Sequence, residues 1–459
     1  MKKMLSLMIT ALFVLSAWPL LADDEREVEP AEELHPFFRD MKFNANLYYF
    51  QRYRDRYDLE SDRYGVNLDH ATAQLSLDLQ SGWLNDLIGF DFGIFGAYDF
   101  RNKSASADHE MNFVPWRDPW HAKWDRIKNK DAASVYKALV KVKSGPVWAR
   151  AGYFQPQGPG VLGVNWSFLP GTYQGAEAGF DLGRWSLAAA WANQYKAPWY
   201  TTTYHFQQQD ADGELHEVGH LWSLGARYQA TDNLSLEVAY GESKNYLWNA
   251  HFKLKYNLPL NGGDSLYLTW QTYFMNDQSA ALDDNFSAMA QHHYLGAVYS
   301  TGPWVINAEG TFTRAPNSEP GQAGYFAYRL TRPSGGSKGA YEPWWDLRSD
   351  WNHHNEKAMF LKVGRSLDDM GLTGVKAAVS GAYGWDGRSS QTSQKFSEAA
   401  LGLDLSYTFS GGGLMDGSVL ALHFTYYDNL TNLPNWNPYH NAFQDEHDIK
   451  LSLVIPLTK

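Results

Sequence analysis

The feature that most constrains this chain is a regular alternation of apolar and polar residues in strand-length segments. In residues 400–409, ALGLDLSYTF, the side chains of Leu401, Leu403 and Leu405 are separated by small or polar residues. Because successive side chains of a β-strand point to opposite faces, this period predicts a strand with one apolar face and one polar face. The glycine-rich SGGGLMDGS then leads into a second alternating segment at 420–426, so the two segments predict a β-hairpin.

The same period recurs along the chain, in TAQLSLDLQ, LSLEVAY, SLYLTWQTYF and DIKLSLVIPL. No apolar run after residue 22 has the length of a membrane-spanning helix, and no long amphipathic pattern of helical period is present. The sequence therefore predicts an all-β protein.

The connections between these segments fall into two classes. SGP, ATDN and NGGD are short turns, whereas Arg101–Asp131 and Asn317–Asn355 are long and rich in polar and aromatic residues. Short turns at one end and long loops at the other are typical of a transmembrane antiparallel β-barrel, although a soluble β-sandwich also has alternating strands. We expect a barrel of about 18 strands, with about 16 as the alternative, periplasmic turns, extracellular loops and an aqueous channel.

The start of the chain predicts export. Residues 1–22 have two lysines, an apolar stretch and a small residue before an acidic run, which is typical of a signal peptide. We expect residues 23–40 to form an acidic tail or a plug, and residues 41–459 to form one barrel domain. The formal net charge is -12 and there is no cysteine, which argues against nucleic-acid binding, disulfides and thiolate chemistry.

Two short motifs have the wrong context for the chemistry they suggest. His216 and His220 with Glu217 match a zinc-protease signature, but that site requires a helix and this segment has the pattern of a loop entering a strand. The GPGVLG of residues 158–163 matches a dinucleotide fingerprint, yet no helix follows it. We therefore expect no enzyme activity, no cofactor and no bound metal.

Residues 145–179, GPVWARAGYFQPQGPGVLGVNWSFLPGTYQGAEAG, carry a leucine-proline pair followed by a threonine and a glycine, at Leu169, Pro170, Thr172 and Gly175. This segment, together with NQYKAPW, EPWWDLRSDWN, NEKA and LHFTYYDN, resembles the OprD-type outer-membrane porins, and within that family its chitoporins. The resemblance spans essentially the whole chain after residue 22. It implies an 18-stranded barrel, an inward-folded third loop, a ladder of arginines and facilitated diffusion of chitooligosaccharides.

The sequence departs from the family pattern beside the leucine-proline pair. The family commonly has an arginine just before it, whereas Trp166, Ser167 and Phe168 precede Leu169 here. A guanidinium at that place would pair with a carboxylate through two hydrogen bonds. Its replacement by aromatic residues argues for a neutral or weakly cationic solute.

The tryptophans divide by position. Trp148, Trp185 and Trp304 each follow a short turn, which predicts an aromatic girdle at the periplasmic rim. Others lie in predicted loops, where a flat ring can cover the apolar face of a sugar. These candidates for sugar contact are Trp116, Trp120, Trp124, Trp166, Phe168 and Tyr173.

Charged residues supply the remaining candidates. Arg52, Arg54 and Arg56 share one face of a predicted strand. The other charged candidates for the pore or its rim are Arg150, Glu177, Asp346, Arg348 and Asp350. Each has an alternative role as a solvated wall residue or as a salt-bridged loop anchor.

We therefore expect an outer-membrane porin for chitooligosaccharides. The alternatives are an OprD-type porin for amino acids, cationic peptides or other oligosaccharides, a glycosidase using carboxylates such as Asp445 and Glu446, and a surface adhesin. The expected partners are the solute, outer-membrane lipid, lipopolysaccharide and the barrel-assembly machinery. The expected oligomeric state is a monomer or a homotrimer.

Overall fold

The computed structural model describes residues 35–104, 111–113, 131–164, 168–210, 212–317, 324–331, 336–388, 394–431 and 444–458. Its strands are β1 (Lys42–Asp58), β2 (Arg63–Gln80), β3 (Ile88–Asn102), β4 (Ala132–Ser144), β5 (Val147–Phe154), β6 (Thr172–Leu182), β7 (Trp185–Lys196), β8 (Tyr204–Gln209), β9 (Leu215–Val218), β10 (Leu221–Thr231), β11 (Leu234–Ser243), β12 (Leu247–Pro259), β13 (Ser265–Asp277), β14 (Ala290–Thr301), β15 (Trp304–Arg314), β16 (Lys357–Ser366), β17 (Val375–Arg388), β18 (Lys395–Thr408), β19 (Val419–Asn429) and β20 (Glu446–Pro456). A short helix, α2 (Pro36–Arg39), and two 3-10 turns, Asn261–Gly263 and Asp368–Met370, complete the regular structure of these residues.

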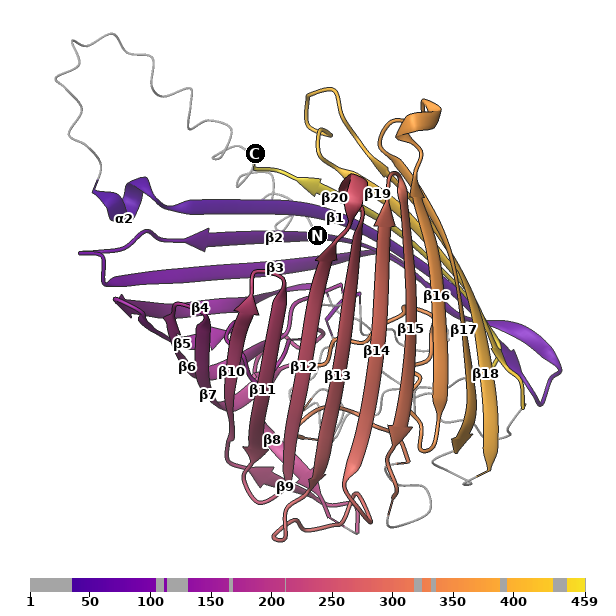
Figure 1. The fold of residues 1–459 in the computed structure, drawn as a ribbon, viewed down its shortest axis with the longest axis horizontal. Coiled ribbons are helices and arrows are strands. Elements are labelled where there is room, and N and C mark those ends of the chain that lie inside the picture. The colour runs from indigo at the N-terminus through magenta and orange to yellow at the C-terminus, as the bar shows by residue number, and fades with distance from the viewer. Residues whose placement is uncertain are drawn as a thin grey trace.

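The strands close into an antiparallel barrel of 18 strands. Each wall strand pairs with the next in sequence, except that β7 pairs along most of its length with β10. The hairpin of β8 and β9 lies between them in the sequence and joins the end of β7 through two residue pairs. The first and last strands, β1 and β20, pair antiparallel and close the wall. Figure 1 shows the near wall from β10 to β18, with β1 to β3 crossing behind it at a steep tilt. The predicted strand number of about 18 is confirmed, and the alternative of about 16 is wrong.

The alternating sequence pattern gives the wall two different faces. Leu401, Leu403 and Leu405 on β18 are exposed on the outer face, as are Leu361 on β16 and Val238 on β11. This exposed apolar band is the surface that a barrel turns toward lipid. No helix among the described residues is long and apolar enough to cross a membrane.

Connections differ in length between the two ends of the barrel, as the sequence predicts. At one end, β4 and β5 are joined by Gly145 and Pro146, and the remaining turns there are also short. At the other end, residues 155–171 join β5 to β6, and residues 315–356 join β15 to β16. These two segments are called the β5–β6 loop and the β15–β16 loop below.

Both loops lie inside the barrel and contact each other. The backbone N–H of Val161 donates to Ser223 Oγ on the inner face of β10 at 2.8 Å, and Lys253 Nζ on β12 donates to the carbonyl of Ala340 at 2.9 Å. The two loops are joined where the N–H of Ala340 donates to the carbonyl of Val161 at 2.8 Å. A buried apolar cluster that includes Leu162 fills the space between the loops and the wall. The inward folding predicted for the third loop is present, and a second loop shares the lumen with it.

The prediction that Trp148 belongs to the aromatic girdle is wrong. Trp185 and Trp304 are exposed on the outer face, whereas the Trp148 ring lies on the inner face, 5.9 Å from the Arg150 guanidinium. Its indole N–H donates to Asp181 at 2.7 Å. The reason is strand parity, because residues 148 and 150 share a face. The predicted signal peptide and most of the acidic segment lie outside the described residues.

Candidate functional site

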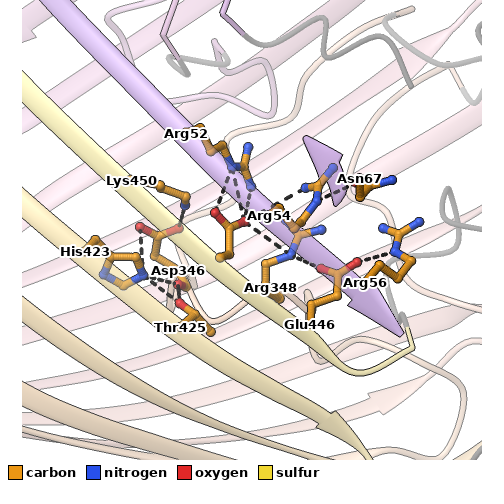
Figure 2. Close-up of polar contacts among 11 residues, drawn as sticks. Arg52, Arg54, Arg56, Asn67, Asp346, Arg348, His423, Thr425, Glu446 and Lys450 are labelled. Atoms are coloured by element: carbon orange, nitrogen blue, oxygen red, sulfur yellow. Dashed lines mark hydrogen bonds and ion pairs between the residues drawn. The ribbon is translucent and has the colours of Figure 1, made fainter. Parts of the chain in front are cut away.

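A network of charged side chains lies on the inner face where β1 meets β20 (Figure 2). Arg52 on β1 binds Asp448 on β20, with Nη2 at 2.6 Å and Nε at 3.0 Å from the carboxylate oxygens. Arg56 binds Glu446 one row further along, and Arg54 reaches Asp448 at 3.9 Å. The alternating period predicts that the three arginines share a face, and this is confirmed.

The β15–β16 loop completes this network from inside the lumen. Arg348 donates to Glu446 and lies 3.5 Å from Asp448, so four guanidiniums surround two carboxylates. Burial acts to lower the pKa of Arg348, but the carboxylates of Glu446 and Asp448 outweigh burial and raise that pKa. Asp346, two residues earlier, pairs with Lys450 of β20. The loop thus adds the cation of Arg348 and the anion of Asp346 to wall strands that already carry cations and anions.

The backbone of this loop is held in an uncommon conformation. Asp346, Arg348, Trp351 and Asn355 all have positive φ, between 51° and 71°. Non-glycine residues persist there only where surrounding contacts determine the conformation, and such residues concentrate at functional sites. Here the carbonyl of Asp346 accepts a hydrogen bond of 2.9 Å from His423 on β19. The loop is therefore fixed to the wall by its backbone as well as by its charged side chains.

Aromatic rings lie beside the charged network on the same face of β1. Tyr48 and Phe50 stack with ring centroids 5.7 Å apart, and Phe168 of the β5–β6 loop meets the Phe50 ring edge-on at 4.7 Å. All three rings are partly exposed. Since Phe50 and Arg52 are two residues apart, the rings and the charges form one continuous surface on the inner face.

The most exposed tryptophan of the described residues also lies in the β15–β16 loop. Trp344 is 67% exposed. On either side of it, Glu342 binds Lys253 on β12 at 2.7 Å and Asp346 binds Lys450 on β20. These anchors place the segment across the lumen, so the exposed indole of Trp344 faces the aqueous interior.

Comparisons with known proteins agree with this architecture. Residues 35–435 match the family model described as outer membrane porin, OprD family. The chain is 36% identical over 450 residues to the chitoporin of Escherichia coli (strain K12), covering 94% of each protein. The chain belongs to the OprD family of outer-membrane porins. It is thus a non-enzymatic channel of the outer membrane, and the glycosidase alternative is wrong.

Solved structures show the same fold at lower sequence identity. Pseudomonas aeruginosa OpdK with vanillate matches with a TM-score of 0.73 at 15% identity, covering 92% of this chain and 99% of that one. Acinetobacter baumannii OccAB1 matches with a TM-score of 0.71 at 17% identity, covering 94% of this chain and 99% of that one. These likenesses support the 18-stranded barrel of the porin.

Three predicted solute contacts are buried in this porin. Tyr173 is fully buried, and its hydroxyl donates to the carbonyl of Lys338 at 2.6 Å, which joins β6 to the β15–β16 loop. Arg150 binds Glu177 at 2.8 Å, and Glu177 also accepts the backbone N–H of Gly158 at 2.9 Å. Burial leaves these three side chains little surface for a solute. The contacts of Arg150 and Glu177 are those of the salt-bridged loop anchor that the sequence left as their alternative.

Other predicted residues have a different outcome. Arg52, Arg54, Asp346 and Arg348 belong to the charged network at the β1–β20 junction, where the side chains of Arg54 and Arg348 are 13% and 11% exposed, and Phe168 packs on Phe50 beside it. The four tryptophans with predicted sugar contacts lie outside the described residues, and they are Trp116, Trp120, Trp124 and Trp166. The protease-like motif does not form a helix, because His216 lies in β9 and binds Asp210 at 2.7 Å.

The sequence analysis missed three residues of this surface. Tyr48 and Phe50 have the same parity as Arg52, so strand period could have placed them beside it. Trp344 stands in the EPWWDLRSDWN segment, but nothing in the sequence distinguishes it from its neighbour Trp345, which is buried against Phe360.

Proposed function

We propose that this porin conducts chitooligosaccharides, short polymers of N-acetylglucosamine, into the periplasm. The observation that carries the proposal is the exposed indole of Trp344, in a segment that Glu342 and Asp346 bind to wall strands on either side of it. A curated relative at 36% identity bears the name chitoporin, which supports the same solute class.

The chemistry of the surface suits a neutral sugar. Pyranose rings have an apolar face of C–H groups that can lie flat on an aromatic ring, so Trp344 and the Tyr48, Phe50 and Phe168 rings can hold successive sugars. The guanidiniums beside them bind Asp448 and Glu446, and guanidinium N–H groups are suitable donors for the hydroxyl and carbonyl oxygens of a sugar. Several weak contacts in series permit both entry and release.

The tryptophans outside the described residues extend this proposal to the entrance. Trp116, Trp120 and Trp124, from a predicted long loop, would receive the sugar chain at the entrance, and Trp166, from the predicted inward-folded segment, would contact it further along. Variants of these residues would then slow entry, whereas a variant of Trp344 would shorten the time for which a sugar stays bound.

The test is single-channel recording in a planar lipid bilayer with chitohexaose, and with maltohexaose as the control sugar. We expect chitohexaose to block the current at micromolar concentration and maltohexaose to have little effect. Trp344→Ala should weaken the block about tenfold, since about 1.4 kcal/mol of lost binding free energy corresponds to that factor. Trp185→Ala is the matched control, because Trp185 is exposed on the outer face.

Three results would contradict the proposal. An open channel that neither sugar blocks would remove the solute assignment and leave the fold intact. Equal block by both sugars would replace chitin specificity by general oligosaccharide binding. Unchanged block in Trp344→Ala would remove the role of the indole.

A second candidate is an OprD-type porin for small carboxylates. The surplus of guanidiniums over carboxylates in the network favours it, because arginine pairs with carboxylates through two hydrogen bonds. Reversal potentials in a salt gradient distinguish the two, since a carboxylate channel should be anion-selective and blocked by benzoate. A channel that selects weakly between anions and cations and is blocked by chitohexaose would support the chitooligosaccharide assignment.

A further inference from the structure

A cluster of metal-ligating side chains lies away from the solute pathway, where the β15–β16 loop enters β16. His353 and Glu356 come from the end of the loop, and Glu398 comes from β18. All three residues are fully buried. One donor atom from each, a histidine ring nitrogen and two carboxylate oxygens, lies within 4.8 Å of the others.

Hydrogen bonds orient the carboxylates of Glu398 and Glu356 and reach three of their four oxygen atoms. Ser349 Oγ donates to Glu398 Oε1 at 2.7 Å, and the Tyr427 hydroxyl donates to Glu398 Oε2. The backbone N–H of His353 donates to Glu356 Oε2 at 2.9 Å. Glu356 Oε1 is fully buried and has no N–H or hydroxyl donor within the described part of the chain, so the only group that can satisfy it there is the Glu398 carboxyl, with which Glu356 forms a hydrogen bond if one of the two is protonated. Polar atoms in that state are rare in folded proteins and call for an explanation, such as an ion.

The charges of the cluster give a second, independent reason. No lysine or arginine of the described residues forms an ion pair with Glu356 or Glu398. Two buried carboxylates in contact cannot both be ionised unless a cation compensates them, so the cluster requires either a shared proton or a metal ion.

We propose that His353, Glu356 and Glu398 form a site for one divalent transition-metal ion, with Zn²⁺ as the best match. An imidazole with two carboxylates is a ligand set that zinc accepts, and two carboxylates neutralise its charge. Zinc bonds of about 2.1 Å place tetrahedral ligands roughly 3.4 Å apart, so donor atoms that lie within 4.8 Å of one another have to approach by at most about 1.4 Å when the ion binds. Ser349 and Tyr427 then fix the orientation of the Glu398 carboxylate from outside the metal shell.

The backbone leaves room for this arrangement. A Cβ atom added at Gly384 of β17 would lie 2.4 Å from Glu356 Oε1 and 3.2 Å from Glu398 Cγ. Only a glycine lets the Glu356 carboxylate lie over β17 beside Glu398. The Gly384→Ala variant therefore disturbs the site while leaving all three ligands in the chain.

The site would fasten the loop that carries the solute-facing residues. It joins the end of the β15–β16 loop to β18, a few residues after Asp346 and Arg348. The metal assignment does not rest on the proposed function, because the ligands are buried and do not face the solute. It adds a cation to the forces that hold the loop inside the lumen.

The experiment is refolding of the full chain without an affinity tag, in detergent, with Zn²⁺ and separately with EDTA. Because all three ligands are fully buried, the ion should enter before the loop docks. After exhaustive dialysis, zinc is measured by inductively coupled plasma mass spectrometry. We expect about one zinc per chain after refolding with Zn²⁺, and resistance of the open channel current to voltage closure above that of the EDTA-refolded protein.

Variants separate this site from surface binding. Glu356→Gln, Glu398→Gln and Gly384→Ala should each reduce retained zinc at least tenfold. His216→Gln, which removes an exposed histidine of the β8–β9 hairpin, should retain it. If a ligand variant fails to fold, the visible absorption spectrum of wild-type protein refolded with Co²⁺ reports the ligand geometry directly.

Three results would refute the zinc site. Wild-type protein that retains no zinc after refolding would show that the two carboxylates share a proton instead. Zinc retained equally by Glu356→Gln and by wild type would place the ion elsewhere. A Co²⁺ spectrum identical to that of the hydrated ion would also overturn the proposal.

Discussion

Asp448 tests whether the network at the β1–β20 junction is a buried ion-pair system. Its carboxylate is fully buried and faces Arg52, whose side chain is 3% exposed, with Arg348 at 3.5 Å and Arg54 at 3.9 Å. The Asp448→Asn variant keeps the volume and one acceptor oxygen but removes the charge. Arg52 then stays buried and loses the carboxylate that it binds.

The expected cost follows from that burial. Removing one partner of a buried ion pair costs about 3–5 kcal/mol, since an uncompensated charge is left in a poorly solvated place. Because asparagine keeps one hydrogen bond to Arg52, we expect a loss of about 3 kcal/mol in the free energy of unfolding. The measurement is urea unfolding of the refolded barrel in detergent, followed by tryptophan fluorescence.

Asp369→Asn is the matched control, since it makes the same chemical change in the exposed pair with Arg365. An exposed pair contributes about 0.2–1 kcal/mol, so the two variants should differ by at least about 2 kcal/mol. The double variant Arg52→Met with Asp448→Leu should recover much of the loss, because it removes both charges together. Equal effects of Asp448→Asn and Asp369→Asn would refute the reasoning.

Three further predictions concern the loops and the outer face. In Gly339→Ala, the new Cβ would lie 2.0 Å from the carbonyl oxygen of Tyr328 in the same loop, so the β15–β16 loop should shift where Ala340 binds Val161, and single-channel records should show a larger, noisier conductance. Burial lowers the pKa of Lys338 to about 8 from the ordinary 10.5. The unfolded chain therefore holds more protons between these values, and stability should rise as pH increases from 8 to 10.5, a rise that Lys338→Met should abolish in pH-dependent melting. Leu403→Lys places a charge on the apolar band and should cost about 2–4 kcal/mol by urea unfolding, whereas a cost below about 0.5 kcal/mol would show that this face is not covered by lipid or detergent.

Sequence reasoning predicted the barrel well because the signal is local. A period of two is visible within one strand, and the difference between short turns and long loops is visible without any contact. Arg52, Arg54 and Arg56 could be assigned to one face for the same reason.

The solute-facing surface was predicted less well because exposure inside the lumen depends on contacts between distant segments. Tyr173 is buried by the backbone of Lys338, which is 165 residues away in the sequence. Trp344 and Trp345 are adjacent, yet one is exposed and the other packs on Phe360. Only the path of the β15–β16 loop decides between them, and no periodic pattern in the sequence specifies that path.

The pairing of β1 with β20 has a consequence for the order in which this protein becomes functional. Arg52 and Arg56 come from the first strand of the wall, while Glu446 and Asp448 come from the last. A chain whose final strand has not yet joined the first therefore has neither a sealed wall nor the charged surface that screens solutes. Pairing of β1 with β20 therefore closes the barrel wall and forms the charged network in one step. An assembly intermediate in which these two strands have not paired would let solutes cross without selecting among them.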